Sequence, residues 1–202
     1  MKTFSGYTQK TAESLQLDAG AFFINYEVEK DTFESAVAAG KLLGATRDGG
    51  EFSAKPSIRQ IQVDGVKGRA KGLETLDSWE VYLSATVLEL TENALKNALT
   101  ATAQTESDVE THSVIAARNN IELSDYYENV TWVGTISGSD EPIIVQVYNA
   151  LNTDGISLTV KDASEGSIKM TFYGHYSQGD LNTPPFKIYY PKNSSQSTGQ
   201  TE

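Results

Sequence analysis

Hydrophobic and polar residues alternate along several segments of the chain, which is the pattern of β-strands with one buried face. The clearest segment is residues 79–90, whose hydrophobic positions are Trp79, Val81, Leu83, Ala85 and Val87. Residues 20–28 have the same period, with one face made of Phe22, Ile24, Tyr26 and Val28. Each segment therefore predicts a strand with one face toward a core and the other toward water or a neighbouring strand.

Shorter hydrophobic segments follow one another in the second half of the chain. Glycine-, serine- and aspartate-rich turns separate them, and they cover residues 127–136, 143–148, 156–160, 168–176 and 186–190. Earlier, residues 57–63 read as a strand, and Asp64-Gly65 after it predicts a type I′ hairpin turn. Many short strands at this spacing are typical of a β-sandwich or a barrel.

Two segments have a helical period. Asp31-Thr32-Phe33-Glu34 has capping-box spacing and predicts a helix that runs until Gly44. Thr91 predicts the cap of a second short helix, which carries Leu95, Ala98 and Leu99. Residues 101–111 are expected to be irregular. The fold class is therefore mainly β with one or two short helices, an α+β chain built on a β-sandwich or partial barrel.

The domain organisation follows from composition. Residues 1–19 are polar and predict an N-terminal arm, in which only Leu15 and Leu17 are strong hydrophobic anchors. Residues 20–191 form one domain, and residues 192–202 have the composition of a flexible tail. Within the domain, the glycines and charges of residues 44–56 predict a long loop, and loops of that length usually have a function.

Charge and composition exclude several classes of function. The net charge of −11 opposes tight nucleic-acid binding, which depends on cationic contacts to phosphate, and residues 91–130 alone carry −5. The chain has no cysteine, so disulfides, thiolate nucleophiles and cysteine zinc sites are excluded. Neither a signal peptide nor a stretch apolar enough to span a membrane is evident, and we expect a cytoplasmic protein without a membrane partner.

Candidate catalytic residues are few. The two histidines, His112 and His175, lie far apart in the sequence, and both read as surface residues, with His175 also suited to an interface. Asp125 and Glu128 read as a solvated acidic edge and not as a catalytic pair. No catalytic or nucleotide-binding motif is present. The sequence therefore predicts that the protein is not an enzyme and needs no cofactor or metal.

The one cationic cluster consists of Lys67, Arg69 and Lys71, which would point to one side of an extended segment. Two interpretations have equal weight. The cluster either docks on an acidic surface of a neighbouring copy, such as the region of residues 91–130, or protects an exposed edge strand from pairing.

Residues 17–99 carry a series of motifs in a characteristic order. These are Leu17-Asp18-Ala19-Gly20, Leu43-Gly44-Ala45-Thr46-Arg47-Asp48-Gly49-Gly50 before Phe52, Ile61-Gln62-Val63-Asp64-Gly65-Val66-Lys67-Gly68, Lys71-Gly72-Leu73, and Leu88-Glu89-Leu90-Thr91 leading into Asn93-Ala94-Leu95. In this order the segments resemble the major tail protein, or tail tube protein, of long-tailed bacteriophages with non-contractile (siphovirus-type) tails. Residues 131–190 fit the same family more loosely.

The resemblance implies a structural virion protein that self-assembles. In that family the subunits form rings, commonly hexameric, that stack into a hollow tail tube for DNA ejection, and strands from each copy line an oligomeric barrel. The loop of residues 44–56 would reach an adjacent ring through Arg47, Asp48, Glu51, Phe52 and Lys55. The polar face of the strand at 79–90 would line the lumen or lie between subunits, through Glu80, Tyr82, Ser84 and Thr86.

The resemblance also implies partners and a location. The tube would contact a tape measure protein, a tail terminator and a distal tail protein, and DNA would pass through the lumen without tight binding. The protein would be assembled in the host cytoplasm and end in the virion tail. An acidic subunit suits such a tube because it repels phosphate.

Two other functions remain open. The first is the tube protein of a contractile injection or type VI-like secretion system, whose subunit fold is similar and which gene context would distinguish. The second is a monomeric β-sandwich that binds carbohydrate through Tyr126, Tyr127, Trp132 and Tyr148. Aromatic residues at such positions are more often part of a core or an interface than of a sugar platform.

Overall fold

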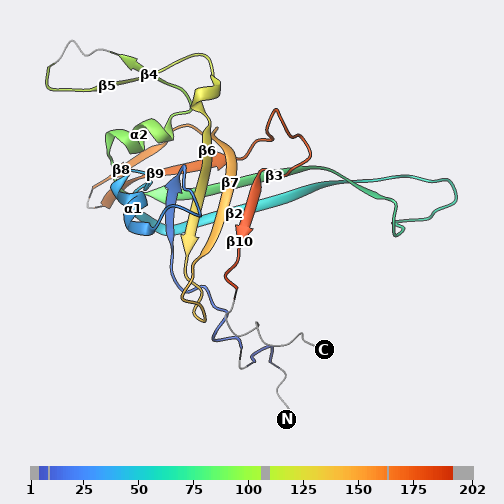
Figure 1. The fold of residues 1–202 in the computed structure, drawn as a ribbon. Helices are drawn as coiled ribbons and strands as arrows, with labels where there is room; N and C mark the ends of the chain where they lie inside the picture. The colour runs from blue at the N-terminus through green and yellow to red at the C-terminus, as the bar shows by residue number, and fades with distance from the viewer. Residues whose placement is uncertain (1–4, 9, 106–109, 163, 193–202) are drawn as a thin grey trace.

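The computed structural model describes residues 5–8, 10–105, 110–162 and 164–192. Eight strands form one antiparallel sheet that folds into two layers, and two further strands form a separate hairpin (Figure 1). The first layer has the strand order β1 (Ala21–Ile24), β6 (Tyr127–Gly134), β7 (Ile143–Asn152) and β10 (Phe186–Tyr189). The second has the order β2 (Thr46–Gln60), β3 (Glu74–Val87), β9 (Ser164–Tyr173) and β8 (Leu158–Lys161).

Strand β7 joins the two layers. Its first part pairs with β6 and β10, and its last two residues pair with β9. Asn149 lies between these parts with φ of 47°, in the left-handed region, so the strand turns sharply there. The path through the sheet ends at β1 and β2, and the described strands do not close into a barrel. The prediction of a mainly β fold with two short helices is confirmed.

The core lies between the two layers. Strand β3 supplies four buried side chains, each at most 3% exposed, namely Val81, Leu83, Ala85 and Val87. Phe22, Val130 and Val147 of the first layer pack on the same cluster. The small residues of helix α2 (Glu92–Ala98) cover one end of it. The prediction that Val81, Leu83, Ala85 and Val87 of β3 face the core is therefore confirmed.

Strand β1 is buried on both faces, and this differs from the prediction. Phe22 faces the main core, while Phe23 is 0% exposed in a second cluster with Tyr26, Ala36 and Ile144. Helix α1 (Phe33–Ala38) covers this outer face of the first layer. An alternating pattern cannot show that a later segment of the chain will fold back over the second face.

The helices begin close to their predicted positions. Thr91 caps α2 as predicted, by accepting a hydrogen bond from the Ala94 amide at 3.0 Å. Thr32, and not Asp31, caps α1 and forms a capping box with Ser35. Helix α1 also ends at Ala38, well before Gly44, because Gly40 adopts a left-handed φ of 70° that closes the helix.

The prediction of a long loop at residues 44–56 is wrong, because most of this segment belongs to β2. Asp48 and Gly49 have positive φ and form a bulge, after which Gly50 pairs with Ala85. A Cβ atom at Gly50 would lie 2.1 Å from the carbonyl oxygen of Ser84, so the glycine permits close packing between strands. Pro56 is tolerated because β2 is an edge strand.

Residues 101–111 were expected to be irregular, but part of this segment forms a strand. Strand β4 (Thr102–Thr105) pairs with β5 (Val114–Ala117) in a hairpin outside the main sheet. A short 3-10 helix, η1 (Leu123–Asp125), leads from this hairpin toward β6. The five strands predicted between residues 127 and 190 all exist, with shifted ends.

The N-terminal arm is held by hydrogen bonds and not by the expected hydrophobic anchors. Leu15 and Leu17 are 42% and 76% exposed. The backbone of Leu15 exchanges hydrogen bonds with Ser137, and Asp18 accepts hydrogen bonds from Thr135. Of the predicted C-terminal tail, residues 193–202 lie outside the described part of the chain.

Candidate assembly surface

Strands β2 and β3 continue as a pair beyond the rest of the sheet. β3 pairs with β9 only from Tyr82 to Val87, whereas its pairing with β2 extends to Gln60 opposite Glu74. In Figure 1 these two strands project far beyond the rest of the fold, and residues 61–73 join them at the outer end. We call residues 55–78 the ribbon and the remainder the body.

The ribbon exposes aliphatic side chains. Ile58 and Leu76 are cross-strand partners, and they are 57% and 51% exposed. Three more exposed aliphatic residues, Ile61, Val63 and Val66, follow in the connection at its outer end. Single exposed hydrophobic residues are common, but a row along a projecting element marks an interaction surface.

The ribbon and the body carry opposite charge. The ribbon holds five cations, Lys55, Arg59, Lys67, Arg69 and Lys71, against three acids, Asp64, Glu74 and Asp77. Its net charge is therefore +2, and since the whole chain carries −11 the body carries −13. This separation favours contact between the ribbon of one molecule and the body of another.

Aromatic residues fix the root of the ribbon to the body. The ring of Phe186 in β10 lies 5.5 Å from Trp79 and 5.7 Å from Phe52, measured between centroids. The amide of Trp79 donates to the hydroxyl oxygen of Tyr176 at 3.0 Å. The ribbon is thus anchored at one end, and its outer part has no partner within the described part of the chain beyond its own two strands.

The five residues predicted to contact an adjacent ring do not lie together on a loop. Arg47 pairs with Glu165 at 2.8 Å, and this hydrogen bond lowers the pKa of the Glu165 carboxyl. Glu51 accepts from the Tyr82 hydroxyl at 2.8 Å, and Phe52 packs against the core. Asp48 lies in the β-bulge. Lys55 is the first residue of the ribbon, and its Nζ lies 6.0 Å from the centroid of the Tyr82 ring in the body.

The cationic cluster lies at the outer end of the ribbon, but not on a strand as predicted. Lys67, Arg69 and Lys71 belong to the connection of residues 61–73, and only Arg69 has a nearby acid, Glu74 at 3.8 Å. The Asp64-Gly65 turn has positive φ at Gly65 alone, so it is not type I′. The three cations are therefore not held on one side of a strand, as the alternation had predicted.

The four candidate lumen residues occupy the outer face of the second layer. Ser84 is only 6% exposed, because larger neighbours flank it on the sheet. Along this face Glu80 stands opposite Lys55, Thr86 opposite Lys169, and Tyr82 opposite Tyr173. The face is polar with charges of both signs, which suits a surface between subunits as well as one facing a lumen.

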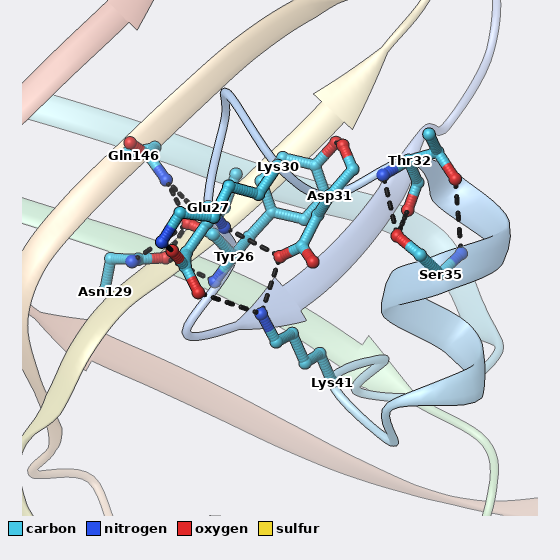
Figure 2. Close-up of polar contacts among 10 residues, drawn as sticks. Tyr26, Glu27, Lys30, Asp31, Thr32, Ser35, Lys41, Asn129 and Gln146 are labelled. Atoms are coloured by element: carbon cyan, nitrogen blue, oxygen red, sulfur yellow. Dashed lines mark hydrogen bonds and ion pairs between the residues drawn. The ribbon is translucent and has the colours of Figure 1, made fainter.

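A buried polar network attaches the segment before α1 to the first layer (Figure 2). The Asn129 side chain bonds both the amide and the carbonyl of Tyr26, at 2.9 and 3.1 Å. Gln146 donates to the same carbonyl at 2.8 Å. Beside it, Lys41 donates to Asp31 at 2.6 Å and lowers the pKa of that carboxyl. No sequence pattern reveals this network, because its residues come from three distant segments.

The aromatic residues considered for carbohydrate binding do not form a platform. Burial raises the pKa of Tyr127 to about 12, and its hydroxyl donates to Asn97 at 2.7 Å. The indole of Trp132 donates to the Ala19 carbonyl at 2.9 Å. Tyr126 and Tyr148 line adjoining surface depressions, so only two of the four residues remain available to a ligand. This arrangement disfavours the sugar-binding alternative.

The remaining polar candidates have structural contacts. Asp125 pairs with Arg118, and His112 bonds the Thr111 hydroxyl at 2.8 Å. Over the described ranges, no group of three or more potential ligands is placed to hold a metal ion, and no helix is long and apolar enough to cross a membrane. A scan against protein-family models and a search of curated proteins gave no match to this chain.

Proposed function

We propose that the protein is a self-assembling structural subunit, the tail tube protein of a long-tailed, non-contractile bacteriophage. Its copies would form rings, hexameric by analogy with that family, which stack into a hollow tube in the virion tail. The observation that carries the proposal is the ribbon, an element that the isolated chain leaves largely uncovered.

The ribbon has physical reasons to pack on other copies. A two-stranded hairpin is only marginally stable alone in water, and this one has free edges on both strands over its outer part. It also exposes the cross-strand pair Ile58 and Leu76. Packing against a sister molecule would bury this surface and bring its positive charge to an acidic body.

The resemblance of residues 17–99 to tail tube proteins supports the specific assignment. In this proposal the ribbon takes the part of the inter-ring connector that the sequence had suggested for residues 44–56. The acidic body suits a tube through which DNA slides without tight binding. Tape measure, terminator and distal tail proteins would be the partners in the virion.

Electron microscopy of the purified protein over a range of concentrations tests the proposal. We expect rings or tubes for the natural chain. A matched variant replaces residues 61–73 with Asn-Gly, which closes a short hairpin, and should remain a folded monomer by circular dichroism and light scattering. A natural chain that stays monomeric at every concentration, or a shortened variant that assembles equally well, would overturn it. Antibody labelling of phage particles then tests the tail location.

A further inference from the structure

A groove runs along the segment of residues 174–185, from η1 to the root of the ribbon. Three adjoining depressions form it, with volumes of about 450, 230 and 400 Å³. His175 and Asn149 line the first two, Pro184 lines the second and third, and Tyr176 lines the first and third. Because neighbouring depressions share side chains, they adjoin one another along this segment.

The groove has a mixed polar and apolar lining, with exposed leucines at two places and an aromatic contact at its floor. Leu123 and Leu181 beside it are 75% and 70% exposed, among the most exposed hydrophobic residues of the body. In the floor, the His175 ring stands edge-on to Tyr126 with centroids 5.1 Å apart. Its Nδ1 bonds the Asn149 carbonyl oxygen at 3.0 Å. These contacts hold the His175 ring in one position, so binding here costs little side-chain freedom at that residue.

The segments that border the groove are acidic. Residues 118–128 and 174–187 contain four acids, Glu122, Asp125, Glu128 and Asp180, and two cations, Arg118 and Lys187, which gives −2. Arg118 is already paired, with Glu122 at 2.8 Å and also with Asp125. A hydrogen bond from Thr183 lowers the pKa of Asp180, so that carboxyl stays ionised.

We propose that this groove receives the outer end of the ribbon from a second copy of the chain, an inference that rests on the proposed function. Ile61, Val63 and Val66 would cover the exposed leucines of the groove, Leu123 and Leu181. The three cations that follow them match the acidic border. The two surfaces are therefore complementary in both polarity and charge.

The placement of the two surfaces sets the symmetry of the contact. Leu76 at the root of the ribbon lines the groove, while the outer end of the same ribbon extends far from it (Figure 1). A molecule therefore cannot fill its own groove with its own ribbon end. Each copy presents a donor and an acceptor, so the contact needs a second copy, and where it is not exchanged reciprocally between two molecules it is head-to-tail and propagates into rings or filaments.

Disulfide cross-linking tests this contact directly, because the natural chain has no cysteine. Two single variants, Val66→Cys in the ribbon and Leu181→Cys in the groove, are mixed under assembly conditions and oxidised. The control mixes Val66→Cys with Val160→Cys, since Val160 is 72% exposed on β8. Docking gives the first pair a high effective concentration, so we expect it to cross-link at least about tenfold faster than the control.

The outcomes separate this inference from the proposed function. If the cysteine-free chain assembles but the two pairs cross-link equally, the groove is not the acceptor and the assembly function stands. If the cysteine-free chain does not assemble, both proposals fail. As a second readout, Leu181→Arg should raise the concentration needed for assembly more than Leu158→Arg does, and equal effects would contradict the groove assignment.

Discussion

Replacing the exposed aliphatic pair of the ribbon with threonine should weaken assembly without weakening the fold. The double variant Ile58→Thr, Leu76→Thr keeps one β-branched residue and gains another, so the strands retain residues that favour β-structure. Both side chains are already about half exposed in the single chain, at 57% and 51%. The loss to the isolated subunit is therefore limited to the buried half of each side chain, about 1 kcal/mol apiece, and lies in the ribbon.

The size of the effect follows from these exposures. Burying a whole Ile or Leu side chain contributes about 1.5–3 kcal/mol, so burying the exposed half of each contributes about 1 kcal/mol. The pair therefore supplies about 2 kcal/mol at each subunit contact, which corresponds to roughly a 30-fold change in the association constant. The concentration at which rings or tubes first form should rise by a similar factor.

Light scattering during a dilution series measures that concentration, and thermal unfolding by circular dichroism checks the subunit. Val160→Thr on β8 serves as a control, because it removes an exposed aliphatic group outside the ribbon and the groove. An unchanged assembly concentration in the double variant would refute the role of the ribbon. A large loss of thermal stability would instead show that the pair belongs to the core of the single subunit.

Three further predictions concern charge, packing and pH. Arg69→Glu should weaken assembly at low salt, with a smaller effect at about 0.5 M salt where exposed charges are screened, and a salt-independent effect would contradict this. Gly50→Ala should destabilise the subunit by about 3 kcal/mol in urea unfolding because of the close strand contact, whereas Gly68→Ala, whose new methyl meets nothing within 4 Å, should be nearly neutral. The hydrogen bond from Lys41 holds the pKa of Asp31 below the usual 3.8 of an aspartate. Its pairing with Lys41 therefore stabilises the fold above that pH and is lost as the pH falls through the folded-state pKa. The stability difference between the natural chain and Asp31→Asn should therefore shrink in acid, and a difference that is constant from about pH 7 to about pH 2 would exclude this role.

Elements whose formation depends on near neighbours were predictable from the sequence. The alternation from Trp79 to Val87 identified β3 and its core face because side chains of a strand alternate by geometry alone. Thr91 identified the start of α2 because its hydroxyl reaches an amide three residues later. The cationic cluster at Lys67, Arg69 and Lys71 was likewise visible as a run of charge.

Distant contacts decided what the sequence could not show. Gly50 looked like a loop residue, but it is needed where Phe22 and Ser84, from two other strands, approach the backbone. Ile58 belongs to a segment that was predicted only as a strand, and the pair β2–β3 extends past the strands that could cover it. A sequence pattern records how side chains are spaced along one segment, whereas only the packing of all segments determines which hydrophobic faces remain open. For this chain, the ribbon and the groove are the faces that packing left exposed, and the proposed assembly depends on them.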